Sequence, residues 1–96
     1  MAYRLTRRAE QDVLRIWQQI ATDNEPAADR LVERLVHHFR LIAANLFLGR
    51  RRSDLREGLR TFPVGEYLIV YRIEEQEALI LHVLHGRRDL QSILSS

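Results

Sequence analysis

Apolar residues recur at helical spacing near the start of the chain. The first stripe consists of Ala9, Val13, Ile16, Trp17 and Ile20. Residues three and four positions apart lie on one face of a helix, and Thr6 can cap that helix because its hydroxyl accepts a free amide of the first turn. The pattern therefore predicts a helix over about residues 7 to 22.

A second apolar stripe follows the segment TDNEP, in which Pro26 is tolerated only in the first turn of a new helix. The stripe consists of Ala28, Leu31, Val32, Leu35, Phe39, Ile42 and Leu46. Its spacing predicts a helix of about five turns that is ended by Gly49. Two consecutive helices of this kind favour an antiparallel hairpin in which the apolar stripes face each other.

The remaining segments have the patterns of β-strands. AYRLT alternates and predicts a short first strand. LRTFPV predicts a strand at an edge or with a bulge, because Pro63 cannot donate a ladder hydrogen bond. EYLIVYRI and ALILHVLH are rich in aliphatic, β-branched and aromatic residues and are separated by a polar turn over residues 74–77. These three segments predict an antiparallel meander.

The last predicted strand is apolar on both of its alternating faces. One face would carry Ala78, Ile80 and Leu84, and the other Leu79, Leu81 and Val83. This pattern is typical of a central strand that is covered on both sides. We expect the helices to cover one side. The other would be covered by the C-terminal tail, through Leu90, Ile93 and Leu94, or by a partner.

Together these elements predict an α+β protein of order β-α-α-β-β-β, in which a helical hairpin packs on a small antiparallel sheet. A chain of 96 residues buries too small a core to divide, so we expect one domain over residues 1–96. No stretch approaches membrane-spanning length, and the first residues lack the apolar core of a signal peptide. We therefore expect a cytoplasmic protein without a membrane partner.

The composition limits the available chemistry. All fifteen basic residues are Arg, and the formal net charge is +2. Arg is a poor proton donor or acceptor, so proton chemistry would need His, Tyr or a carboxylate. There is no Cys, which excludes disulfides and thiolate metal ligands. We expect His37 and His38 to be fully or partly exposed on the second helix, with His38 at the margin of the apolar stripe, and His82 to be satisfied within the sheet. Neither a metal site nor another cofactor is therefore predicted.

Three segments carry a resemblance to a known family. NEPAADRLVERL, GRRRSDLREGLRTFPVGEYLIVYR and VLHGRRDL occur in the order, and among the predicted elements, that resemble the ParE toxins of the RelE/ParE superfamily. The resemblance covers nearly the whole chain. It implies a toxin of a bacterial type II toxin-antitoxin pair, which forms a hetero-oligomer with a ParD-like antitoxin and acts on DNA gyrase when free. RelE-like relatives share the fold but cut messenger RNA on the ribosome.

The side chains favour binding over cleavage. A ribosome-dependent ribonuclease needs a proton-transfer pair and cations around the phosphorane. The Arg that RelE-like nucleases place after the Tyr of their GYR strand falls here on Leu68, and their strand lysines have no counterpart. Their C-terminal Arg matches Arg88, but the later Tyr matches Leu94. We therefore predict no catalytic residue.

Two other functions stay open. The first is a ribonuclease that uses His85 as the acid or base, with Arg88 and Arg60 as the cations. The second is a non-toxic member that binds an antitoxin and nothing else.

The predicted contact residues are mostly Arg. For the target we expect contacts from Arg50, Arg51 and Arg52 and, through the resemblance, from Arg87 and Arg88. The alternative for residues 50–52 is a solvated loop partly neutralised by Asp54 and Glu57, with at most weak, non-specific affinity for nucleic acid. For the antitoxin we expect Trp17, at the margin of the first stripe, and Leu14 further round the same side, although core packing also explains Trp17.

Overall fold

Two helices and five strands follow one another in residues 2–86, the part of the chain that the computed structural model describes. In chain order they are β1 (Tyr3–Leu5), α1 (Arg7–Ala21), α2 (Glu25–Ala44), β2 (Arg50–Arg51), β3 (Arg60–Val64), β4 (Tyr67–Glu74) and β5 (Glu77–His85). The predicted α+β class and the helical hairpin are confirmed. The strand β2 was not predicted, because two residues are too few to show an alternating pattern.

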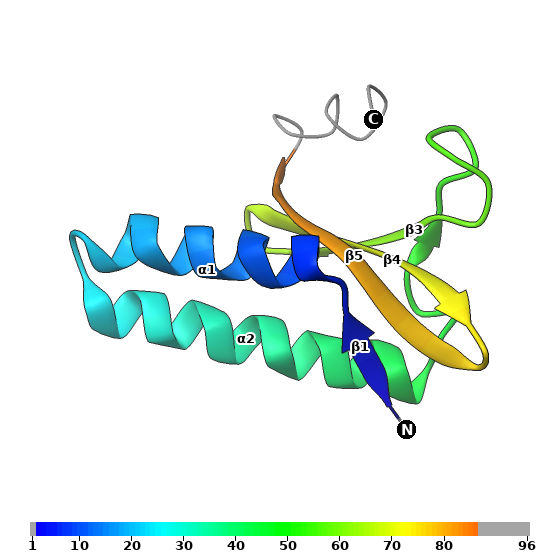
Figure 1. Ribbon diagram of the computed structural model, residues 1–96, viewed down its shortest axis with the longest axis horizontal. Helices are drawn as coiled ribbons and strands as arrows, with labels where there is room; N and C mark the ends of the chain where they lie inside the picture. Colours follow the sequence, from blue (N-terminus) through cyan, green and yellow to red (C-terminus); the bar gives the residue numbers. More distant parts are fainter. Residues whose placement is uncertain (1, 87–96) are drawn as a thin grey trace.

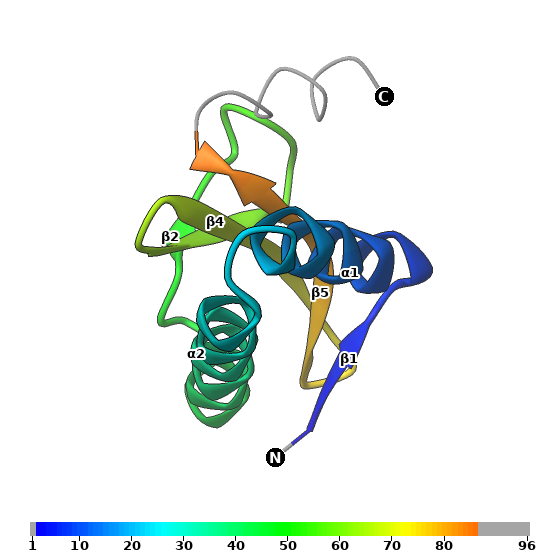
Figure 2. The same cartoon turned by 90° about the vertical axis from the view of Figure 1, so that its left-hand side faces the viewer.

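The strands form one sheet of order β1-β5-β4-β3-β2. The predicted antiparallel meander of β3, β4 and β5 is confirmed, and β2 extends it at one edge. The sheet is mixed rather than purely antiparallel, because β1 pairs parallel with β5. Both helices cover one face of the sheet, and the connection between β2 and β3 rises on the opposite side (Figures 1 and 2).

The helix boundaries follow from capping side chains. Thr6 accepts a hydrogen bond from the Ala9 amide at 3.1 Å at the start of α1, as predicted. Asn24 does the same for the Ala27 amide at the start of α2, also at 3.1 Å. The predicted end of the second helix was wrong: α2 ends at Ala44, and Asn45 caps it. Leu46 lies beyond the helix but still packs against the core.

Gly49 has a different function from the predicted one. A Cβ atom at this position would lie 2.6 Å from the ring of Tyr71, a distance that real Cβ atoms do not tolerate. The amide of Gly49 donates a hydrogen bond to the Tyr71 hydroxyl at 2.7 Å, and that hydroxyl donates to the Leu46 carbonyl at 2.9 Å. Glycine is therefore required here because the chain crosses a buried tyrosine at close range.

The main core lies between the helices and the sheet. Its fully buried side chains include Leu35, Phe39, Ile42, Ile69, Tyr71 and Ile80. A second, smaller apolar cluster lies on the opposite face, with Leu59, Val70 and Leu84 buried and Leu55, Leu68 and Leu81 packed against them. We call this group the second-face cluster. β5 therefore packs on both sides, as predicted, and Leu55 and Leu59 of the connection between β2 and β3 contribute to its second side. The predicted cover by the C-terminal tail lies outside the described residues.

A bulge in β5 changes which residues share a face. Val70 pairs with His82 and Tyr71 with Ile80, so Leu81 has no partner on β4. The extra residue shifts the alternation of the strand. Val83 consequently joins the main core, and Leu84 joins the second-face cluster. The predicted grouping of Leu84 with Ala78 and Ile80 was therefore wrong.

Candidate functional site

Leu68 is the residue that the family resemblance matches to a cation of RelE-like nucleases. It lies on β4 opposite Pro63 of β3 and Leu84 of β5, and it packs against the second-face cluster. Its surroundings are thus aliphatic side chains, which cannot stabilise the charge of a phosphate undergoing substitution. This part of the sheet is built as an apolar surface and offers no phosphate-binding cation at that point.

The structure does not bring together the residues of the ribonuclease alternative. Arg60 pairs with Tyr71 and His85 with Tyr67, four residues apart along β4 and on opposite flanking strands. Ideal strand spacings put their Cα atoms roughly 16 Å apart. Arg87 and Arg88 lie outside the described residues, as do Leu90, Ile93 and Leu94 of the tail. This distance is too long for Arg60 and His85 to act at one reaction centre.

His85 and Arg60 each have local partners. The ring of His85 meets Tyr67 edge-on with the centroids 5.2 Å apart, and its Nε2 lies 3.9 Å from a Glu66 carboxylate oxygen. Burial, and after it the Glu66 charge, raises the pKa of Tyr67. Arg60 donates from Nη1 to the Gly49 carbonyl at 2.9 Å. Both side chains therefore contribute to local packing at opposite ends of the sheet.

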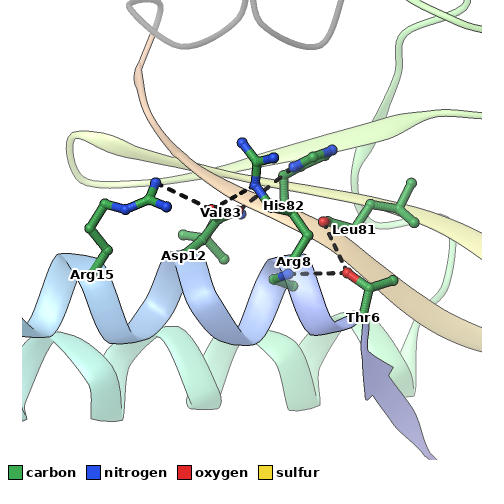
Figure 3. Close-up of polar contacts among 8 residues, drawn as sticks. Thr6, Arg8, Asp12, Arg15, Leu81, His82 and Val83 are labelled. Carbon is green, nitrogen blue, oxygen red and sulfur yellow. Dashed lines mark hydrogen bonds and ion pairs between the residues drawn. The ribbon is translucent and has the colours of Figure 1, made fainter. Parts of the chain in front are cut away.

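A buried carboxylate joins α1 to β5 (Figure 3). Asp12 is only 4% exposed. Its Oδ2 accepts the Val83 amide at 3.1 Å, and its Oδ1 accepts Nε of Arg8 at 3.2 Å. Nη1 of Arg15 lies 3.9 Å from the same Oδ1. Asp12 thus supplies a hydrogen-bond partner to the edge of β5, beyond the point where the short strand β1 ends.

His82 lies beside this carboxylate but is not hydrogen-bonded to it. Its Nδ1 is 3.7 Å from Oδ2 of Asp12, is buried, and has no hydrogen-bond partner among the described residues. The expectation that His82 would be satisfied within the sheet was therefore wrong for this nitrogen. Burial alone would raise the pKa of Asp12, but His82, the Val83 amide and Arg8 together hold that pKa below its usual value.

Asp12 was missed in the sequence because a charged residue in an amphipathic helix is ordinarily read as solvent-facing. Its position three residues after Ala9 and four before Ile16 was the available signal, since all three lie on the buried side of α1.

A cleft of about 290 Å³ opens next to Asp12, lined by Arg8, Arg15, Gln19, Tyr67 and the end of β5. No group of three or more metal-binding side chains exists among residues 2–86.

The three consecutive arginines are not a simple loop. Arg50 and Arg51 are exposed and form the edge strand β2, and Arg52 forms two hydrogen bonds of 3.0 Å with Asp54. Hydrogen bonding to Arg52 lowers the pKa of Asp54. Arg51 lies 4.0 Å from Glu57, so the predicted partial neutralisation is present. Charged side chains at a sheet edge also discourage pairing with other strands, which is a structural reason for Arg50 and Arg51.

The two residues predicted to bind the antitoxin lie in different environments. Leu14 is 55% exposed on α1. Trp17 is half-buried, and its indole nitrogen donates to Asp29 of α2 at 2.8 Å. Trp17 therefore links the two helices, and Leu14 is the more exposed of the two residues. His37 is exposed and His38 is half-buried, as expected. The His38 ring lies against Phe62 with the ring centroids 5.6 Å apart.

The structure is that of a small α+β protein with a helical hairpin on one face of a five-stranded mixed sheet. A solved structure described as the chromosomal ParDE TA system from P. aeruginosa has the same fold, with a TM-score of 0.78, 21% sequence identity, and coverage of 91% of this chain and 97% of that one. Toxin ParE3 of Caulobacter vibrioides is 36% identical over 90 residues, which cover 93% of this chain and 90% of the relative. The family model of the ParE toxin of type II toxin-antitoxin systems, parDE, matches residues 3–90. The chain belongs to this ParE toxin family.

Neither helix of the described part of the chain is long and apolar enough to cross a bilayer.

Proposed function

We propose that this ParE-family toxin acts by binding DNA gyrase rather than by cutting RNA, and that a ParD-like antitoxin neutralises it. The observation that carries the proposal is the position of Leu68 within the second-face cluster. A RelE-like nuclease would need a cation there, whereas Leu68 is a half-buried aliphatic side chain that cannot stabilise the charge of a phosphate undergoing substitution.

The surrounding residues support the same proposal. Arg60 is engaged by Gly49 at one end of the sheet, and His85 lies against Tyr67 at the other. A single imidazole contributes only about 10² to 10⁴-fold to a reaction when it acts without charge stabilisation. The described residues therefore suit a binding protein better than a ribonuclease.

The test is the supercoiling reaction. Purified toxin at a stoichiometric ratio to gyrase is expected to block ATP-dependent supercoiling of relaxed plasmid, and prior addition of the antitoxin encoded beside it should restore the reaction. Full supercoiling in the presence of excess toxin would reject the gyrase target. Mapping of messenger RNA ends after induction tests the ribonuclease alternative, which predicts new cuts at the ribosomal A site.

The proposed antitoxin surface includes the outer side of α1. Leu14 leaves more than half of its side chain in solvent, and an amphipathic partner helix binds such residues in an apolar seam. We expect Leu14→Asp to weaken the antitoxin complex by about tenfold or more, measured by calorimetry, because it places a charge in that seam. Gln19→Asp on the side of α1 that lines the cleft is the matched control. Equal losses in both variants would remove Leu14 from the interface.

A further inference from the structure

An aromatic side chain projects from the turn between α2 and β2. Phe47 is 72% exposed, which makes it the most exposed large apolar side chain among residues 2–86. Its neighbour Leu48 is 39% exposed, and Leu41 in the last turns of α2 is 41% exposed. Three of the four large exposed apolar residues in the described chain therefore fall within eight positions, while Leu14 lies apart on α1.

The turn that carries Phe47 is held by hydrogen bonds. Oδ1 of Asn45 accepts the Phe47 amide at 3.3 Å, and the Asn45 carbonyl accepts the Leu48 amide at 3.0 Å. On either side, the Leu46 carbonyl and the Gly49 amide bind the buried hydroxyl of Tyr71 at 2.9 and 2.7 Å. The backbone position of Phe47 is thus fixed without the burial of its ring, so binding a partner requires little further ordering of the chain.

An arginine lies against the ring. The guanidinium carbon of Arg60 lies 5.1 Å from the centroid of the Phe47 ring, within the range of a cation–π contact. Arg51 lies directly opposite Arg60 on the exposed edge strand β2, so the two side chains share one face of the sheet, whereas Arg50 lies opposite Thr61 on the other face. Arg51 is 4.0 Å from Glu57, and no ion pair of Arg60 with an acidic side chain occurs among the described residues. Phe47 is therefore flanked by positive charge on the side of β2 and β3.

Folding does not explain this arrangement. A side chain that is 72% exposed buries little apolar area, and the hydrogen bonds of the turn use backbone atoms and Asn45 rather than the ring. Aromatic residues and arginines are the residue types most enriched among interface residues that dominate binding. An exposed ring flanked by arginines is the composition of such a contact.

We infer that Phe47, Arg51 and Arg60 form the centre of the surface by which this toxin binds its target protein. The partner would present an apolar pocket that receives the Phe47 ring, with carboxylates at the rim that pair with Arg51 and Arg60. The inference rests on the proposed function, since it assumes a protein target. It adds Phe47 to the arginines expected to contact that target, and it separates this surface from Leu14, the expected antitoxin contact.

The experiment compares Phe47→Ser and Arg51→Glu with Leu14→Ser, which removes an exposed apolar side chain from α1 instead. Three quantities are measured for each full-length variant: the concentration that half-inhibits gyrase supercoiling, growth arrest on induction, and the dissociation constant of the antitoxin complex. We expect Phe47→Ser and Arg51→Glu each to reduce inhibition and growth arrest by about tenfold or more while antitoxin affinity changes less than threefold. Leu14→Ser should weaken the antitoxin complex and leave inhibition and growth arrest nearly unchanged. Thermal unfolding checks that every variant is folded.

Several results would overturn the inference. The first is unchanged gyrase inhibition by both Phe47→Ser and Arg51→Glu. The second is a loss of antitoxin affinity instead of gyrase inhibition in these variants, which would assign the surface to the antitoxin. If the wild type arrests growth without inhibiting gyrase, the proposed target is wrong, but a loss of growth arrest in Phe47→Ser would still support this surface. If the wild-type toxin does not arrest growth on induction, both proposals are rejected.

Discussion

At the scale of single residues, Tyr71 connects the core to the turn that carries Phe47. Its ring is fully buried among the side chains of the main core, and its hydroxyl binds both Leu46 and Gly49. Burial raises the pKa of Tyr71, although the Gly49 amide and the charge of Arg60 act in the opposite direction. The hydroxyl therefore stays protonated at neutral pH and can both donate and accept.

Removing this hydroxyl should destabilise the protein. In Tyr71→Phe, the Gly49 amide and the Leu46 carbonyl lose their partner, and an unsatisfied buried polar group costs about 1–3 kcal/mol. We expect the free energy of unfolding, measured by urea titration, to fall by that amount. Tyr3→Phe is the control, because the Tyr3 ring packs against Phe39 and no hydrogen bond of its hydroxyl occurs among the described residues. If the two variants lose the same stability, the Tyr71 hydrogen bonds do not hold the turn.

At the scale of secondary structure, the turn between β4 and β5 carries strain. Glu74 pairs with Glu77, and the two residues between them, Glu75 and Gln76, have φ values of 52° and 65°. Two-residue hairpin turns with positive φ at both positions favour Asn and Gly, because other side chains crowd the backbone in this region. The chain places a non-glycine residue at both positions and is stabilised there mainly by the long strands that the turn joins.

Replacing Gln76 with glycine should relieve this strain. We expect Gln76→Gly to raise the free energy of unfolding by about 0.5–1 kcal/mol, since glycine adopts positive φ without steric cost. The control is Gln11→Gly in α1, where glycine should lower stability by about 1 kcal/mol. Both changes are read from urea titrations. A loss of stability in both variants would mean that the turn does not adopt the positive φ values in solution.

The helices and the meander were predictable because each repeats its pattern over many residues. The bulge at Leu81 was not, because an unpaired residue in β5 is defined only by its register with β4. The same limit applies to the candidate site. Leu68 could be singled out only through the family resemblance. Phe47 could not be singled out at all, since its exposure depends on Tyr71 and Arg60, which come from strands later in the chain.

At the scale of the whole molecule, the two ends of the described chain are joined through α1 and β5. β1 pairs with the start of β5, and Thr6 donates from its hydroxyl to the Leu81 carbonyl at 3.2 Å. Asp12 then binds Val83, which lies 71 residues later in the sequence. Contacts this distant in sequence leave no local pattern, which is why neither the parallel pairing of β1 nor the hydrogen bond from the Val83 amide to Asp12 could be predicted.

Asp12 should make the stability of the whole fold depend on pH. Its pKa is lower in the folded protein than in the unfolded chain, where a value of about 3.9 is usual. The carboxylate therefore contributes stability that is fully present above about pH 4 and is lost as the pH falls through the folded pKa. In Asp12→Asn the charge is absent at every pH, so the loss of stability between pH 7 and pH 3 should be smaller than in the wild type.

The size of the effect follows from the partners that the charge binds. At pH 7 we expect Asp12→Asn to lower the free energy of unfolding by about 1–3 kcal/mol, because Arg8 and the Val83 amide lose a charged acceptor. Asp54→Asn is the matched control: Asp54 also has a lowered pKa, but it is exposed, and its pair with Arg52 is screened by solvent. Urea titrations at the two pH values separate the variants. If the free energy of unfolding falls by the same amount between pH 7 and pH 3 in Asp12→Asn and in the wild type, the charge of Asp12 does not stabilise the fold. A neutral acceptor would then bind β5 equally well.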